Sequence, residues 1–400
     1  MRRKDDLFRL INAMSKSEKR YFTLDAQKSG KEGAKYLRLF RLINKMEVYD
    51  EALLQAHFPK SLPTDKRYLY EAILRSMRDY RSAKSRAAQI KERILDSRYL
   101  YERGLYKQFD DRLKEARQIA LELDDHFSLL EIIRETLLAK QNLTIYKRTS
   151  LDDLRQMSQK KEASLQAVLD ELRYLDLYVQ LFGEIIREFV LREEAQKQAL
   201  SQRMPPEIFD PEYVPPSASA ELRLLKCRAF FFQLTGADDE VFLNWRAVLD
   251  WWEKHPKIKE EHFFRYIIDV SNLLNTCFKI KKYESHIPPL LARLEKEKPR
   301  SKHDGRVLFQ KLTISKLLYF INNGDLETAK MLLPGIEKGL KKHQLGNDLV
   351  IVGNVVFLLF MTGDFAQCLE WSRKIIGRKS EKREDIQRII RIFNLISLYE

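Results

Sequence analysis

The chain has 400 residues and a formal net charge of +14, and its composition is 44% hydrophobic and 32% charged, with only 13 Gly and 12 Pro. Few helix breakers and many Leu, Lys, Glu and Arg residues, which lose little rotamer freedom in a helix, favour an all-α fold large enough for two or three domains or one extended repeat array. Three cysteines at positions 227, 277 and 368 exclude a disulfide framework, and we expect them to be small core residues in a reducing compartment.

Basic residues concentrate in the first quarter of the chain. Residues 1–100 contain 24 Lys and Arg against 13 Asp and Glu, a balance of +11, whereas the other 300 residues contribute only +3. Such an asymmetry fits an acidic partner, such as nucleic acid, an acidic protein surface or anionic lipid, and it equally fits a surface that serves only solubility. We therefore predict a basic helical N-terminal domain over residues 1–94.

The first residues of the chain are charged and show no apolar stretch typical of a secretory signal. The longest apolar run extends from Leu349 to Met361 and is too short to cross a bilayer. The expected location is the cytoplasm, and no membrane partner is expected.

Short helices are predicted at the start of the N-terminal domain. Ser15 and Glu18 have the spacing of a capping box, in which each side chain accepts a hydrogen bond from the backbone N–H of the other. Gly30 and Gly33 break the chain before a second helix. The apolar residues of that helix should face a core: Leu37, Phe40, Leu42 and Ile43.

A short helix and a long basic helix follow. Asp50 should cap a helix that ends near Pro59, and Thr64 or Asp65 should start the long one. Short helices before a basic helix resemble a helix-turn-helix arrangement, in which the second helix enters a DNA groove and phosphates are contacted by Lys and Arg. The residues of this candidate basic patch are Lys66, Arg67, Arg75, Arg78, Arg81, Lys84 and Arg86.

The middle of the chain, residues 95–202, is predicted to form long helical hairpins. Residues 152–200 contain no proline, and leucines recur at steps of three and four residues. A proline-rich connector over residues 203–219 then marks the clearest boundary, because five prolines between positions 204 and 216 exclude a helix. The connector is either a hinge or a strap held on a helical surface by Ile208, Phe209 and Tyr213.

A repeat appears in residues 220–400. Gly324-Asp325 is followed by Ala329, and Gly363-Asp364 is followed by Cys368 at the same spacing. Glycine suits the left-handed end of one helix, aspartate caps the next, and a small residue lets the two helices cross closely. With further turns expected near residues 236 and 281, the pattern resembles the tetratricopeptide repeat (TPR) family, although no unit carries the full consensus. The resemblance implies an α-solenoid that binds peptides or proteins on its concave face.

A polar residue recurs nine positions before three of these turns. These residues, Asn272, Ser315 and Asn354, are candidates for a peptide groove, because amides there could bind the backbone of an extended peptide. Alternatively, they satisfy one another between neighbouring repeats. Lys311 and Lys316 lie nearby and would favour an acidic peptide, and Lys316 is included in the candidate groove.

No motif for catalysis, a cofactor or a metal is found. The seven histidines form no metal-binding pattern, and His255 and His262 are separated by the helix-breaking Pro256. We therefore expect that the protein is not an enzyme and that it binds neither a cofactor nor a metal ion. The leading hypothesis is a non-enzymatic adaptor or scaffold that binds a protein partner, and the alternative is a regulator that binds nucleic acid through the basic N-terminal helix.

Two further observations concern the ends of the chain. The stretches Ser15–Phe22 and Lys35–Asn44 are similar to uncharacterised helical proteins of Bacteroidota bacteria, a resemblance that implies no mechanism. Residues 384–400 should form the first helix of another pair, and this helix is rich in apolar residues. We expect it to be covered by self-association, by the connector or by further chain, unless its outward-facing residues are polar.

Overall fold

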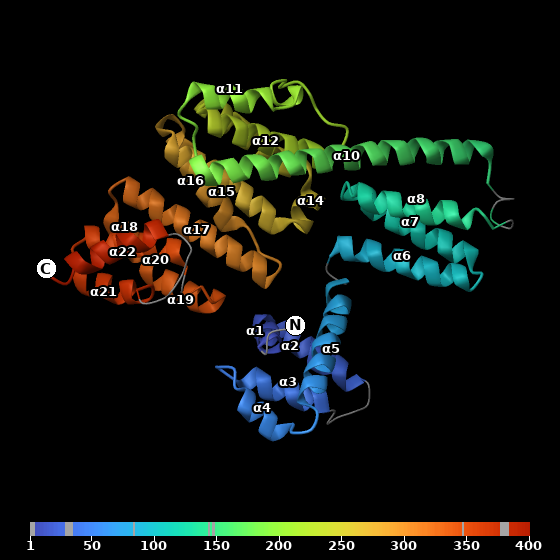
Figure 1. The fold of residues 1–400 in the computed structure, drawn as a ribbon, viewed down its shortest axis with the longest axis horizontal. Coiled ribbons are helices and arrows are strands. Elements are labelled where there is room, and N and C mark those ends of the chain that lie inside the picture. The colour runs from blue at the N-terminus through green and yellow to red at the C-terminus, as the bar shows by residue number, and fades with distance from the viewer. Residues whose placement is uncertain are drawn as a thin grey trace. The chain divides into compact units, whose positions relative to one another are not determined.

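The computed structural model describes residues 5–28, 35–82, 85–142, 145, 149–345, 348–376 and 384–400. Over these residues the chain is helical and contains no strand, which confirms the predicted all-α class (Figure 1). The chain divides into two compact units, residues 1–164 and residues 165–400. Within the described part, none of the helices combines the length and the apolar character that a membrane span requires.

Five helices form the first core of unit 1. They are α1 (Asp6–Ala13), α2 (Lys16–Lys28), α3 (Lys35–Lys45), α4 (Glu51–His57) and α5 (Leu62–Ser82). The capping box is confirmed: Ser15 N donates to Glu18 Oε2 at 2.6 Å, and Glu18 N donates to Ser15 Oγ at 3.2 Å. Asp50 caps α4 as predicted, since its side chain accepts a hydrogen bond from Leu53 N. The apolar residues predicted on α3 do face the core, with Leu42 only partly buried.

The prediction of one continuous basic helix is wrong. The helix α5 ends at Ser82, and α6 (Arg86–Glu102) is a separate element. Ser85 starts α6, because its side chain accepts a hydrogen bond from Ala88 N and satisfies one of the unpaired N–H groups of the first turn. The helix α5 also begins slightly earlier than predicted, at Leu62. Pro63 lies in its first turn, where backbone N–H groups have no partner within the helix, so the missing N–H of proline has no cost.

The rest of unit 1 contains the expected hairpins. The helices α6 and α7 (Tyr106–Glu122) pack against each other, and α8 (His126–Ala139) packs on both. Gly104 makes the first turn with a left-handed φ of 73°, which glycine adopts without steric cost. Asp125 caps α8 through a hydrogen bond from Ser128 N.

Residues 151–188 correct the prediction of long hairpins up to residue 202. They form one continuous helix, α10 (Leu151–Glu188), rather than two antiparallel ones. The reason is local, because this stretch has no proline, and a single glycine does not end a helix. The shorter α11 (Glu194–Gln202) follows after a break at residues 189–193.

The proline-rich connector is an ordered strap. It contains one 3₁₀ turn, η1 (Pro206–Ile208), and Ile208 is buried as expected. Arg228 of the helix beneath holds the strap: this buried side chain donates to the backbone carbonyls of Glu207, Asp210 and Tyr213. Phe209 is only half buried and meets the ring of Phe231 edge-on. The hinge interpretation is therefore not supported.

Unit 2 continues as consecutive helical pairs. The first helix of each pair is α12 (Ala218–Thr235), α15 (Phe263–Lys279), α17 (Lys302–Asn322) and α20 (Leu349–Met361). The segments that return are α13 (Asp238–Lys254), η2 (Lys281–His286) with α16 (Ile287–Lys296), α18 (Leu326–Met331) with α19 (Leu333–His343), and α21 (Phe365–Arg373). The short α14 (Pro256–Glu261) links the first two pairs, and α22 (Glu384–Ile396) follows the last.

The turns of these pairs show the predicted chemistry. Gly324 and Gly363 have left-handed φ values of 72° and 69°. Asp325 accepts a hydrogen bond from Thr328 N, and Asp364 accepts one from Gln367 N. The small residues Ala329 and Cys368 are fully buried. At the turn expected near residue 281, the 3₁₀ helix η2 takes the place of a tight glycine turn.

Neighbouring pairs pack in sequence order. The second part of each pair contacts the first helix of the next: α13 contacts α15, α16 contacts α17, α18 contacts α20, and α21 contacts α22. The first helices α15, α17, α20 and α22 also contact one another in order. Two buried apolar clusters result, and each continues through several pairs.

The cysteines are buried core residues, as predicted, and none is paired in a disulfide. Burial raises the pKa of the Cys227 thiol to about 12 and that of Cys277 to about 11. Both thiols are therefore protonated near neutral pH, which suits a packing role rather than nucleophilic chemistry.

Candidate interaction surfaces

Convergent titratable groups are the usual mark of a catalytic or metal site. Among the described residues, no three His, Cys, Asp or Glu side chains gather in a way that could hold a metal ion. The Nδ1 atom of His255 lies 2.8 Å from the carbonyl oxygen of Trp251 at the end of α13, and its ring stacks on the Trp251 ring.

The candidate peptide groove is only partly supported by the positions of its residues. Asn272, Ser315 and Asn354 lie on α15, α17 and α20, which contact one another in that order. Ser315 corrects the prediction, because it is 2% exposed and its hydroxyl is not on the surface. The amide of Asn354 donates to Val350 O of its own helix at 2.8 Å, and Asn272 is half-buried.

The lysines beside this candidate groove are also engaged. Lys316 forms an ion pair with Glu295 of α16. Burial lowers the pKa of Lys311, an effect that the nearby Asp348 partly opposes. Lys316 is therefore already paired, and both lysines are only partly exposed to a ligand.

The candidate basic patch separates into residues with partners and residues without. Lys66 lies 2.6 Å from both Glu51 Oε2 and Tyr49 Oη, and Arg86 pairs with Glu122 across α6 and α7. Lys84 lies outside the described residues. The remaining four arginines are exposed and have no ion-pair partner within the described chain: Arg67, Arg75, Arg78 and Arg81.

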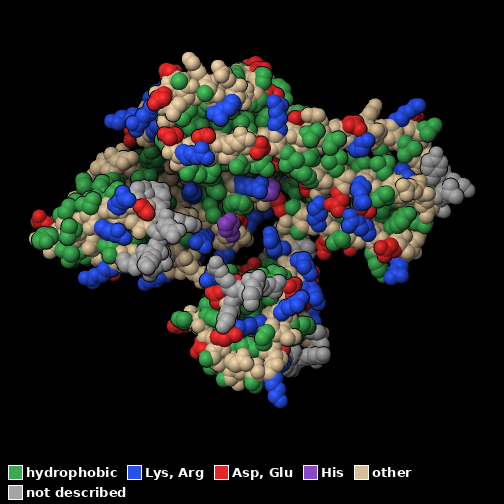
Figure 2. All heavy atoms as spheres, viewed as in Figure 1, with side chains coloured by type: hydrophobic (Ala, Val, Ile, Leu, Met, Phe, Trp, Pro, Cys, Tyr) green, Lys and Arg blue, Asp and Glu red, His purple; other side chains and the backbone are tan. Residues whose placement is uncertain are grey.

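These four arginines, which we call the α5 arginine face, share one side of the helix. At 3.6 residues per turn they fall within an arc of about 120°. Figure 2 shows Lys and Arg side chains along an edge of α5. Glu71 lies within the same arc, so the face is basic but not uniformly so.

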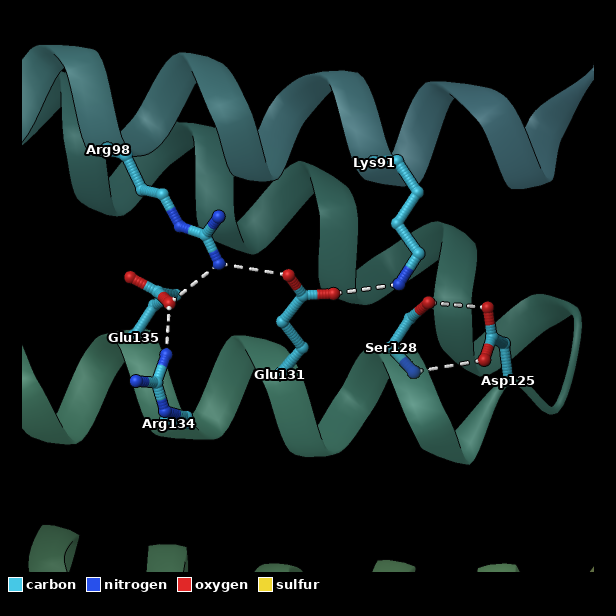
Figure 3. A network of polar contacts seen from close by, with 7 residues as sticks. All are labelled: Lys91, Arg98, Asp125, Ser128, Glu131, Arg134 and Glu135. Carbon is cyan, nitrogen blue, oxygen red and sulfur yellow. Dashed lines mark hydrogen bonds and ion pairs between the residues drawn. The ribbon is translucent and has the colours of Figure 1, made fainter. Parts of the chain in front are cut away.

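The basic residues of α6 are neutralised instead. Arg98 donates to Glu131 and to Glu135 at 2.9 Å, and Lys91 donates to Glu131 at 2.7 Å (Figure 3). The hydrogen bond from Lys91 lowers the pKa of Glu131, so this carboxylate stays ionised. Arg93 pairs in the same way with Glu115 of α7 at 3.0 Å. The positive charge of α6 is therefore paired with carboxylates of α7 and α8 and is less available to a ligand than that of the α5 arginine face.

A surface that sequence reasoning missed lies on α10. Four apolar residues spaced by seven positions, and a fifth between the first two of them, are 41–69% exposed: Leu165, Leu172, Val179 and Ile186, with Leu169. We call this set the α10 stripe. Several large apolar side chains exposed on one side of a helix are typical of an interaction site, although Asp176 is exposed between Leu172 and Val179. The strict seven-residue spacing is the signal that could have revealed it, but leucines at steps of three and four residues equally predict a packed helical hairpin.

Comparisons with protein-family models, with curated proteins and with solved structures find no match to this chain.

Proposed function

We propose that the protein is a non-enzymatic cytoplasmic adaptor or scaffold that binds a protein partner. The architecture that supports this proposal is the array from α12 to α22, which we interpret as a TPR-like solenoid. Three of the pairs turn at a glycine with a left-handed φ, at Gly236, Gly324 and Gly363, and each pair contacts the next, as solenoid repeats do. The polar residues Asn272 and Asn354 remain candidate contacts on its first helices.

The observation that carries the proposal is the exposed α10 stripe. An apolar stripe with a seven-residue spacing fits the apolar side of another amphipathic helix, because side chains at that spacing stay on one face of a helix that winds around a partner. The partner we propose is therefore a protein segment that folds as, or already is, an amphipathic helix.

The test is affinity capture from the source cells with the full chain as bait. The variant Leu172→Glu/Val179→Glu should lose partners that the wild type retains, because it places two charges in an apolar interface. Leu243→Glu is the matched control, since Leu243 is 55% exposed and lies on α13. Circular dichroism should show the same helix content for all three proteins. If all three capture the same partners, the α10 stripe is not the binding surface.

Nucleic-acid binding is the second candidate, and the α5 arginine face is the observation that favours it. Unpaired, exposed guanidinium groups on one side of a helix can contact successive phosphates. Binding of this kind is driven by counterion release, so log K should fall by about 0.9 for each phosphate contact per tenfold rise in salt.

Its test compares two variants with equal change of net charge. Arg67→Glu/Arg78→Glu/Arg81→Glu should abolish retention of duplex DNA or RNA at low salt. Lys338→Glu/Lys341→Glu/Lys342→Glu alters exposed lysines of α19 and should leave retention largely intact. Equal losses in both variants would indicate that only the overall charge matters, and an absence of retention in the wild type would exclude this function.

A further inference from the structure

The helix α22 is held firmly against the rest of unit 2 by its inner side. Phe393 stacks on Phe360 with ring centroids 4.5 Å apart, and Ser397 Oγ donates to Cys368 Sγ at 3.4 Å. Gly353 of α20 allows a close approach, because a Cβ atom there would lie only 2.9 Å from Ile386. The outer side of α22 is therefore presented in a defined orientation.

That outer side is apolar. Its large side chains are 40–85% exposed: Ile389, Ile392, Leu395, Ile396 and Tyr399. Figure 2 shows hydrophobic side chains gathered at the end of unit 2 where α22 lies. Charged residues are exposed along the same helix, namely Glu384, Arg388 and Arg391, but every exposed residue from Ile392 to Tyr399 is Ile, Leu or Tyr. We call these five residues the α22 face.

The charges beside the α22 face indicate which partner fits. Helical hydrogen bonding continues beyond the helix, since Glu400 N donates to Ile396 O. If two copies of α22 pair antiparallel about a two-fold axis with Ile392 of each opposite Ile396 of the other, Arg388 of each copy lies opposite Glu400 of the other. Among the described residues, Arg388 pairs with Glu384 of its own helix, in an exposed pair with side chains 74% and 66% accessible, so it can exchange partners at little cost.

We propose that the α22 face is a homodimer interface, in which two copies of this chain pair through antiparallel α22 helices. The five exposed side chains present on the order of 600 Å² of apolar surface, which approaches the roughly 800 Å² per partner of a standard interface. A two-fold interface needs a surface that is complementary to itself. An apolar centre with Arg388 towards one end and Glu400 at the other meets that requirement, and Arg391 is also exposed on this helix. This dimer is independent of the α10 stripe.

Sedimentation velocity of the full chain tests the proposal over concentrations up to about 100 μM, a range that covers weak interfaces of this size. The wild type should pass from monomer to dimer. Ile392→Glu should weaken the dimer at least about 100-fold, because the two-fold axis places two unpaired carboxylates in an apolar contact. Val179→Glu on α10 is the control and should dimerise like the wild type, which separates this interface from the adaptor surface.

A charge exchange tests the register. Arg388→Glu should weaken the dimer about tenfold, because it places two like charges opposite each other, and Arg388→Glu/Glu400→Arg should restore it. Circular dichroism and tryptophan fluorescence must show that each variant is folded. A monomeric wild type, a dimer that survives Ile392→Glu, a dimer lost in Val179→Glu, or a failure of the charge exchange to restore association would each overturn the proposal. A monomeric wild type would assign the α22 face to a different protein or to further chain.

Discussion

The buried ion pair between Lys226 of α12 and Asp269 of α15 offers a stringent test of how unit 2 is held together. Lys226 Nζ lies 2.6 Å from Asp269 Oδ2, and their side chains are 11% and 5% exposed. The same carboxylate oxygen accepts a hydrogen bond from Trp252 Nε1 of α13 at 2.9 Å. One carboxylate thus joins three helices.

Asp269→Asn should destabilise unit 2 by about 3–5 kcal/mol, because the Lys226 ammonium would remain buried without its counter-charge. The amide oxygen still offers an acceptor to Trp252, so the loss would report on charge rather than on shape. In Lys226→Met/Asp269→Asn the buried charge is removed as well, and most of the stability should return, with a coupling free energy of at least about 2 kcal/mol.

Urea unfolding followed by tryptophan fluorescence is the assay. All four tryptophans, at positions 245, 251, 252 and 371, belong to unit 2, so the signal reports on this unit and not on unit 1. Lys226→Met alone is the companion measurement that closes the cycle. If Asp269→Asn and the double variant unfold at the same urea concentration, the charge of Lys226 contributes nothing and the reasoning fails.

Three further predictions concern single sites in unit 2. Gly324→Ala should destabilise the unit by about 1–2 kcal/mol in the same urea assay, because the left-handed φ of 72° strains any residue with a Cβ atom. Gly335→Ala is the control: this glycine lies within α19 and faces open space, so alanine should stabilise the unit by up to about 1 kcal/mol through its higher helix propensity. Arg228→Met should make the strap over residues 206–216 the first site of limited proteolysis, since three carbonyls lose a donor worth about 1.5–3 kcal/mol each; an unchanged cleavage pattern would contradict its role. The pKa of His343 is lowered chiefly by burial and also by the positive charges of Lys342, Arg306 and Lys302. The imidazole of His343 therefore binds a proton less tightly in the folded state than in the unfolded chain, where the pKa of histidine is about 6.5. The free energy of unfolding should therefore fall as the pH drops below about 6.5, because protonation of His343 favours the unfolded chain. In thermal unfolding, His343→Gln should lose less stability over this pH range than the wild type.

Local chemistry was the most predictable part of this chain. The cap at Ser15 and Glu18, the cap at Asp50, and the turns at Gly324 and Gly363 depend on residues a few positions apart, so their geometry follows from the sequence. The break at Ser85 is equally local but competes with strong helix formers on both sides, so helix propensity alone predicts one helix there.

Side-chain partners were less predictable than helices. Nothing in the spacing of Lys91 and Arg98 reveals that Glu131, a long way along the chain, will neutralise both of them. Ser315 follows the same register as Asn354, yet it is buried. Which basic or polar residue remains available depends on the neighbouring helix that packs over it.

By itself, the sequence determined the all-α class, the caps and turns, and the consecutive helical pairs of residues 218–373, because helix propensity and turn conformation arise within a few residues. Only the tertiary structure decided that the proline-rich connector is a strap fixed by Arg228. It also decided that the α5 arginine face has no ion-pair partner among the described residues, whereas the basic residues of α6 have partners, and that the apolar residues of the α10 stripe and the α22 face remain exposed. A periodic apolar pattern indicates that a helix has a face to cover, but what covers that face depends on contacts between distant parts of the chain.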